Sequence, residues 1–177
     1  MATSCALTQD FNLNADCRDA IGGIKAVYLI EIGNVVSVTD ASGMVTAIQK
    51  APGTVFRKYT LILATSKASD SLTVNEQTGT IFSAHSLEIV INKRNANTRN
   101  EIMILGRVNV QAVVTDNNGK SFLYGRDFGL TLGAGTGDTG TAWGDRNGYT
   151  LPFAGNEREL ALEVGDDVMA TLQTPGV

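Results

Sequence analysis

Cysteine is scarce in this chain. Cys5 and Cys17 are the two cysteines among 177 residues, and both lie in a polar N-terminal segment. Two cysteines cannot build a disulfide framework, and the thiols of proteins folded in a cytoplasm are normally kept reduced. We therefore expect free thiols of minor structural importance. A Cys5–Cys17 disulfide and half of an intersubunit metal site are the alternatives that stay open.

Long hydrophobic runs and an excess of basic residues are also missing. No apolar run approaches the roughly 20 residues that a membrane helix needs, and residues 1–17 lack a basic start followed by an apolar stretch. We therefore expect a protein made and folded in a cytoplasm. The formal net charge of -4 argues against a general nucleic-acid clamp, because gripping phosphates requires a surplus of Lys and Arg on one face.

Groupings of residues that carry chemistry are rare. The single histidine, His85, has no Cys or carboxylate near it at a ligand-like spacing, and no Ser or Cys lies in a recognisable nucleophile turn. Residues 135–140 match the GxGxxG dinucleotide fingerprint, but Trp143 and its neighbours forbid the helix that must hold the pyrophosphate. We expect no catalytic residue, cofactor or metal site, and a structural or surface role for His85.

β-forming residues and turn residues are abundant. Thr, Val and Ile together number 45, and the 19 glycines are spread between short apolar runs. This composition predicts a mainly β fold: a β-sandwich or open barrel with one short flanking helix, a long hairpin and an extended N-terminal arm. We expect residues 1–19 to form the arm, because their apolar residues are isolated, and residues 20–177 to form a single β domain.

Hairpins are expected at two places. A strand, turn and strand over residues 27–39, with the turn at 33–34, predict the first hairpin. The second spans residues 108–132, where the Asn-Gly pair at 118–119 is the strongest hairpin signal in the chain.

Two long strands are expected at residues 55–66 and 80–93, separated by a polar turn region. Both faces of the second strand mix apolar and polar residues, so we expect its own core to cover one face and a partner to cover part of the other. Strand character resumes at residues 149–164, and residues 166–177 predict a last short strand and a tail.

One helix is expected at residues 98–106. Thr98 and Glu101 fit a capping box, and Gly106 ends the helix. The glycine-rich stretch 133–148 has too few apolar groups to offset its loss of chain entropy. We expect this loop to be mobile or to be ordered by a neighbour.

Charged residues gather in two places. Basic residues surround the expected helix, and acidic residues cluster toward the C-terminus. A solvated strand face is the simple account of the acidic cluster, and a surface past which an anionic polymer slides is the alternative. A contact between the two clusters in neighbouring subunits would explain both. With the loop tryptophan, the candidate inter-subunit residues are Lys93, Arg94, Arg99, Trp143, Glu157, Glu159 and Glu163.

Several segments, taken in order, resemble those of a known family. They are CRD at 17–19 leading into GGIKAVYL at 22–29, the strand pair within 55–93, the Thr98-capped helix, and GYTLPFAG at 148–155 followed by the acidic stretch. In this order, over most of the chain, they resemble the tail tube, or major tail, proteins of tailed bacteriophages.

The resemblance implies that hairpins from six subunits join into a continuous inner β-barrel. Such rings stack into a hollow tube through which double-stranded DNA passes without specific binding. The implied partners are copies of this chain and other phage tail proteins, and the implied location is the virion tail, assembled in the bacterial host cytoplasm. The lumen of that family tends to be negative, which repels phosphate. The candidate lumen-facing residues are Asp70, Glu76 and Glu88.

Two other functions stay open besides that of a tube subunit without enzymatic activity. The chain can be another phage structural component, namely a neck, terminator or capsid decoration protein. A neck or terminator protein would form a single ring that does not stack further, and a decoration protein would bind the capsid shell. It can also be a glycan-binding β-sandwich that stacks Trp143 on a sugar ring.

Overall fold

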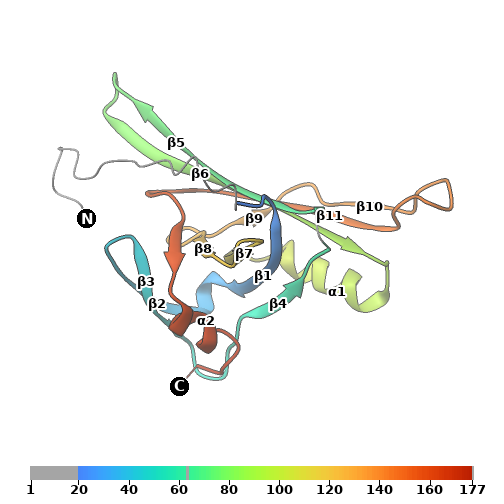
Figure 1. Ribbon diagram of the computed structural model, residues 1–177, viewed down its shortest axis with the longest axis horizontal. Helices are drawn as coiled ribbons and strands as arrows, with labels where there is room; N and C mark the ends of the chain where they lie inside the picture. The colour runs from blue at the N-terminus through green and yellow to red at the C-terminus, as the bar shows by residue number, and fades with distance from the viewer. Residues whose placement is uncertain (1–19, 63, 177) are drawn as a thin grey trace.

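The structure is a computed structural model that describes residues 20–62 and 64–176. The expected N-terminal arm at 1–19 and both cysteines lie outside the described residues. The described chain forms two β-sheets and two α-helices (Figure 1). This confirms the mainly β, sandwich-like fold that the composition predicts.

The larger sheet has seven strands in the order β2-β3-β12-β8-β7-β1-β4. Neighbouring strands are antiparallel except β12 and β3, which run parallel. The strands are β1 (Ile24–Glu31), β2 (Val35–Ala41), β3 (Met44–Lys50), β4 (Arg57–Thr60), β7 (Val110–Asp116), β8 (Ser121–Tyr124) and β12 (Leu162–Val164).

The smaller sheet has the order β10-β11-β6-β5, and the short β9 also pairs with β11. Its long strands β6 and β11 extend past the larger sheet in Figure 1, and the β5–β6 hairpin forms one end of the molecule. The strands are β5 (Lys67–Asn75), β6 (Thr80–Asn92), β9 (Thr131–Leu132), β10 (Thr136–Asp138) and β11 (Gly148–Glu157).

Two hydrophobic cores lie on the two faces of the seven-stranded sheet. The first fills the space between the sheets and under α1 (Ala96–Leu105), with Leu87 of β6, Phe153 of β11 and Val114 of β7 among its buried residues. The second includes Val113 of β7 and Val168 of α2 (Asp166–Thr171). Because successive side chains of β7 point to opposite faces and six of its seven residues are buried, this strand supplies both cores.

The expected first hairpin is wrong. β1 pairs with β4 and β7, and the 3-10 turn η1 (Ile32–Asn34) leads the chain away into β2, which pairs with β3 instead. The actual hairpin turn is at Ser42 and Gly43, which both have positive φ. Two positive φ values in a two-residue turn match the right-handed twist of the flanking strands. The second hairpin, around Asn118-Gly119, is confirmed as β7 and β8.

The strand expected at 55–66 is much shorter than predicted: within that range the described residues form a strand only at Arg57–Thr60, which is β4. The polar stretch expected to be a turn contains the strand β5, which pairs with β6 over its full length. A strand needs hydrogen-bond partners more than apolar side chains, and β6 supplies those partners. The expected strand at 80–93 is confirmed as β6.

The N-cap of the helix lies three residues before the expected one. Asn95 is the N-cap, and its side-chain oxygen accepts a hydrogen bond from the backbone N–H of Thr98 at 2.8 Å. Asn is as good a cap as Thr, and it lies where the chain turns out of β6. Glu101 instead accepts a hydrogen bond from the Tyr59 hydroxyl at 3.0 Å.

The last expected strand is a helix, α2. Asp166 and Asp167 lie in its first turn, where carboxylates interact favourably with the helix dipole, and Val168 and Leu172 are buried on one side. The buried amine of Lys50 donates to the carbonyl oxygens of Thr171, Leu172 and Thr174. Lys50 therefore ties the C-terminal segment to β3.

Candidate functional site

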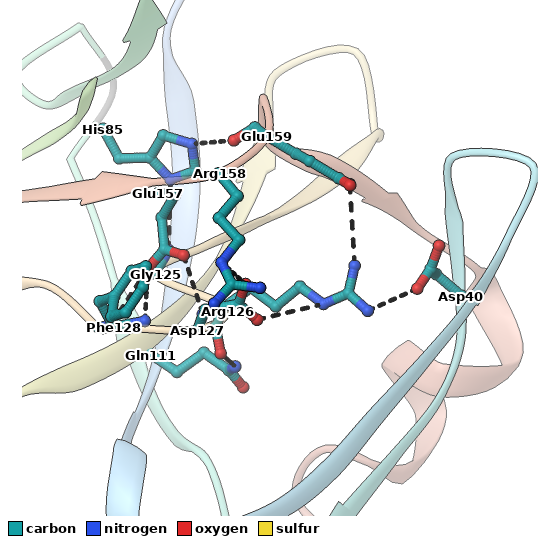
Figure 2. A network of polar contacts seen from close by, with 11 residues as sticks. Asp40, His85, Gln111, Gly125, Arg126, Asp127, Phe128, Glu157, Arg158 and Glu159 are labelled. Carbon is teal, nitrogen blue, oxygen red and sulfur yellow. Dashed lines mark hydrogen bonds and ion pairs between the residues drawn. The ribbon is translucent and has the colours of Figure 1, made fainter. Parts of the chain in front are cut away.

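A network of polar side chains surrounds the turn at residues 125–129, which follows β8 (Figure 2). Glu157, at the end of β11, accepts hydrogen bonds from the backbone N–H groups of Asp127, Phe128 and Gly129 at 2.9, 2.9 and 3.1 Å. The carboxylate is almost fully buried. Three such donors satisfy a buried carboxylate, so Glu157 fixes this turn.

Two glycines allow the turn to approach β11 closely. A side chain at Gly155 would collide with the carbonyl oxygen of Gly129. Gly129 itself has a φ of 78°, a conformation that residues with a side chain rarely adopt. The backbone can therefore reach the Glu157 carboxylate.

His85 joins the same network from the inner face of β6. The backbone N–H of Gly125 donates to its Nδ1 at 3.3 Å, and its Nε2 lies 3.1 Å from the carbonyl oxygen of Glu159. This geometry assigns the proton to Nε2, which donates to that carbonyl. The ring packs edge-on against Tyr124.

Arginines cover the outside of the turn. Arg126 pairs with Asp40 at 2.6 Å and lies 3.8 Å from Asp127 and 4.0 Å from Glu159. Arg158 lies 3.8 Å from Asp127 and stacks over the Phe128 ring. These pairs join β2, the turn and the segment after β11.

The network is suited to holding the turn rather than to chemistry. Both nitrogens of His85 and both oxygens of Glu157 are engaged by backbone groups, so neither side chain is free to transfer protons to a substrate. Two further buried atoms, Ser83 Oγ and Gln111 Oε1, have no hydrogen-bond partner among the described residues. In that same part of the chain, no three His, Cys, Asp or Glu side chains are grouped to hold a metal ion, and no helix is long and apolar enough to cross a membrane.

The acidic residues near the C-terminus do not form one contact surface. Glu157 lies inside its own subunit, so its predicted role in an inter-subunit contact is wrong. Glu163 pairs with Lys120 at 2.6 Å, and Glu159 lies near Arg126. Sequence spacing could not show this, because the partners come from the two turns that flank β8.

The basic residues around α1 are exposed, and their role in an inter-subunit contact stays a prediction. Arg94 stacks over the Tyr149 ring at 5.2 Å, and Arg99 donates a hydrogen bond to Asn100. Lys93 has a φ of 65° at the bend between β6 and α1, where its backbone N–H donates to Asn147.

The three candidate lumen residues lie in different places. Asp70 is on the inner face of the smaller sheet, opposite His85, and accepts a hydrogen bond from the backbone N–H of Ala161 at 3.0 Å. Glu76 is in the β5–β6 turn, and Glu88 is on the outer face, directly opposite Lys67. Of the three, only Glu88 contributes to the outer face of the strand region.

An apolar patch on the β5–β6 hairpin is the feature that the sequence analysis missed. Leu72, Val74 and Ile81 are on the inner face of the sheet, in line with the buried Leu87, yet they are 48%, 61% and 58% exposed. We call these three residues the hairpin patch. The alternation of Leu72 and Val74 in a polar stretch was the available signal for it.

Hydrogen bonds within the glycine-rich loop hold its turn, and the expectation that a neighbour orders the loop stays a prediction. The Asp145 carboxylate accepts hydrogen bonds from the backbone N–H groups of Thr141 and Ala142, both at 2.8 Å. These hydrogen bonds, with Ala142 the largest contribution, hold the pKa of Asp145 below its ordinary value. Trp143 stands at the tip of this loop, fully exposed.

Comparisons of the chain with protein-family models, with curated proteins and with solved structures find no match.

Proposed function

We propose that this chain is a self-assembling structural subunit, the tube protein of a bacteriophage tail. The observation that carries the proposal is the hairpin patch, where the core-facing side of the smaller sheet continues past the larger sheet. Apolar residues that lie in line with a core but that the described residues of the chain leave uncovered are typical of a surface that a partner completes. A second copy of the same chain is the simplest source of that surface.

The edges of the smaller sheet support assembly. β5 pairs with β6 on one side, and no described strand pairs with its other side. A long edge strand with free N–H and C=O groups adds readily to another sheet. Joining such sheets around a ring closes them into one barrel and removes the free edges.

The outer face of the smaller sheet suits the wall of a conduit. No described element covers it in Figure 1, and it consists largely of small polar residues, such as Ser69 and Ser71 of β5 and Ser86 of β6. In β5, β6 and β11 its charged residues are Lys67 and Glu88, opposite each other. A neutral, hydroxyl-rich wall gives DNA phosphates no cluster of cations to bind.

Electron microscopy of the purified protein tests this function. We expect rings at low concentration and stacked tubes at high concentration, since complementary ring faces allow stacking to continue. A strictly monomeric protein at every concentration contradicts the proposal. Single rings that never stack would identify a neck or terminator protein instead, and binding to a glycan array that needs Trp143 would identify a lectin-like module.

The proposed location follows from this function. Subunits assemble in the cytoplasm of the bacterial host and become part of the virion tail, with copies of the chain and other tail proteins as partners. Antibodies against the chain should label intact particles along the length of the tail.

A further inference from the structure

Two projections lie at opposite ends of the smaller sheet. Figure 1 shows the turn of the β5–β6 hairpin at one end of the long axis and the loop between β10 and β11 at the other. The hairpin carries the hairpin patch, and the loop carries Trp143. Each projection therefore presents apolar side chains that residues 20–62 and 64–176 of its own subunit leave exposed.

Hydrogen bonds hold the loop backbone on both sides of Trp143. Asp145 closes the turn beneath it through the N–H groups of Thr141 and Ala142, and the Gly140 N–H donates to Asp138 at 2.9 Å. Arg146 donates to the carbonyl oxygen of Tyr149 and the hydroxyl of Thr150. Because the loop backbone is already held, binding through the exposed Trp143 side chain costs little backbone entropy, and a tryptophan is typical of the residues that dominate an interface.

One pair of opposite charges is available between the two ends. Glu76 is the one charged residue of the hairpin between Asp70 and His85, and it lies in the turn. Arg146 is the cation next to the Trp143 tip, and like the carboxylates of Asp138 and Asp145 it makes hydrogen bonds within the loop. Opposite charges favour one relative orientation of two copies.

We propose that the Trp143 loop of one copy packs onto the hairpin patch of the next, with Arg146 close to Glu76 of that next copy. This contact rests on the proposed function and specifies how one ring binds the ring above it. It is heterologous, because it joins two different surfaces, and it can repeat without limit along the tube.

A second possible binding site for Trp143 is less suited to stacking. An apolar groove of about 630 Å³ lies between β3 and the C-terminal segment, lined by Val36, Ile48 and Pro175 among others. It belongs to the seven-stranded sheet and α2, away from the two ends of the smaller sheet (Figure 1). This groove provides the matched control for the experiment.

Fluorescence gives a direct test, because Trp143 is the only tryptophan in the chain. When purified protein is concentrated until tubes form, its emission should shift to shorter wavelength and acrylamide quenching should fall. Trp143→Ala should leave the Tm of the subunit unchanged and raise the concentration needed for stacking roughly tenfold or more, while rings still form. Tubes in which Trp143 stays as quenchable as in the free subunit overturn the contact but not the tube function.

Paired variants test whether Trp143 binds the hairpin patch or the groove. Val74→Asp should block stacking, whereas Val36→Asp, at a similarly exposed valine in the groove, should not. The reverse result places Trp143 in the groove and overturns the proposal.

A charge exchange tests the proposed ion pair. Glu76→Arg and Arg146→Glu should each weaken stacking, and the double variant should restore it. If stacking still requires Trp143 but the double variant restores nothing, the two charges do not meet and that part of the contact is overturned. If the wild-type protein never assembles, the tube function and this contact both fail.

Discussion

Glu157 and Glu159 are two residues apart on the segment that ends β11, yet their surroundings differ completely. Glu157 is buried and accepts three backbone hydrogen bonds, while Glu159 is exposed and has one long ion pair with Arg126 at 4.0 Å. A surface ion pair of this kind contributes little to stability, but loss of a buried acceptor leaves its donors unsatisfied.

Glu157→Ala should therefore lower the free energy of unfolding by about 2–4 kcal/mol, because three N–H groups lose a charged acceptor. Glu159→Ala is the matched control and should have a much smaller effect. Urea denaturation at pH 7 measures both. Equal losses in the two variants would show that the Glu157 hydrogen bonds do not hold the turn.

Two tyrosine side chains make stability depend on alkaline pH. Burial, with a smaller contribution from the Asp70 charge, raises the pKa of Tyr124 to about 12. Burial, followed by the charge and hydrogen bond of Glu101, also raises the pKa of Tyr59 above its ordinary value. Since the folded state binds these protons more tightly than the unfolded state, their stabilisation is complete below about pH 10 and is lost as pH rises further.

We expect the Tm of wild-type protein to fall steadily from pH 10 to pH 12, and Tyr124→Phe to reduce that slope, because Phe has no proton to lose. Thermal unfolding at pH 8 and at several values from pH 10 to pH 12 checks this, with the pH 8 values correcting for any direct effect of the substitution. An unchanged slope in the variant contradicts the assignment to Tyr124.

Among the elements, α1 shows how a local signal can be right about a helix and wrong about its start. Thr98 and Glu101 have the spacing of a capping box, but Asn95 caps the helix and Glu101 binds Tyr59 of β4. The choice between the two caps depends on where β6 ends, and pairing with β11 decides that.

Asn95→Ala should destabilise the protein by about 1 kcal/mol, the usual contribution of an N-cap side chain. Thr98→Ala should cost less, because the Thr98 backbone N–H, not its hydroxyl, makes the cap hydrogen bond. Chemical denaturation of the two variants distinguishes the caps. A larger effect of Thr98→Ala would favour the cap that the sequence suggests.

The β5 strand illustrates the same point for a sheet. Its polar sequence predicts a turn region, but β6 pairs with it along its whole length and makes the stretch a strand. Once β5 is a strand, the alternation of Leu72 and Val74 puts them on the inner face beside Ile81. The hairpin patch is thus a product of pairing and not of local propensity.

At the scale of the whole molecule, the proposed tube depends on the outer face of the smaller sheet. Wild-type tubes should not retain double-stranded DNA, because that face has no cluster of cations. Replacing two outer-face serines, Ser71→Lys with Ser86→Lys, should make tubes retain DNA at low salt and release it as salt increases. A DNA pull-down on sedimented tubes measures this.

The control for that experiment puts the same charges elsewhere. Ser37→Lys with Thr39→Lys adds two lysines to the exposed part of β2 on the larger sheet. These tubes should behave as wild type. Equal retention by both variants would mean that the smaller sheet does not face the DNA.

The sequence by itself determined the features that depend on near neighbours in the chain. These are the mainly β composition, the long strand β6, the hairpin at Asn118-Gly119 and the existence of α1. Each depends on β-forming composition, on the backbone preferences of a turn or on residues that begin and end a helix, which act within about ten residues.

The tertiary structure alone decided which surfaces remain free. Burial of Glu157, pairing of β2 with β3 and the exposure of Leu72 and Val74 all depend on contacts between residues far apart in the chain. A carboxylate is buried or solvated according to the donors that folding brings to it, and an apolar residue is core or contact surface according to what covers it.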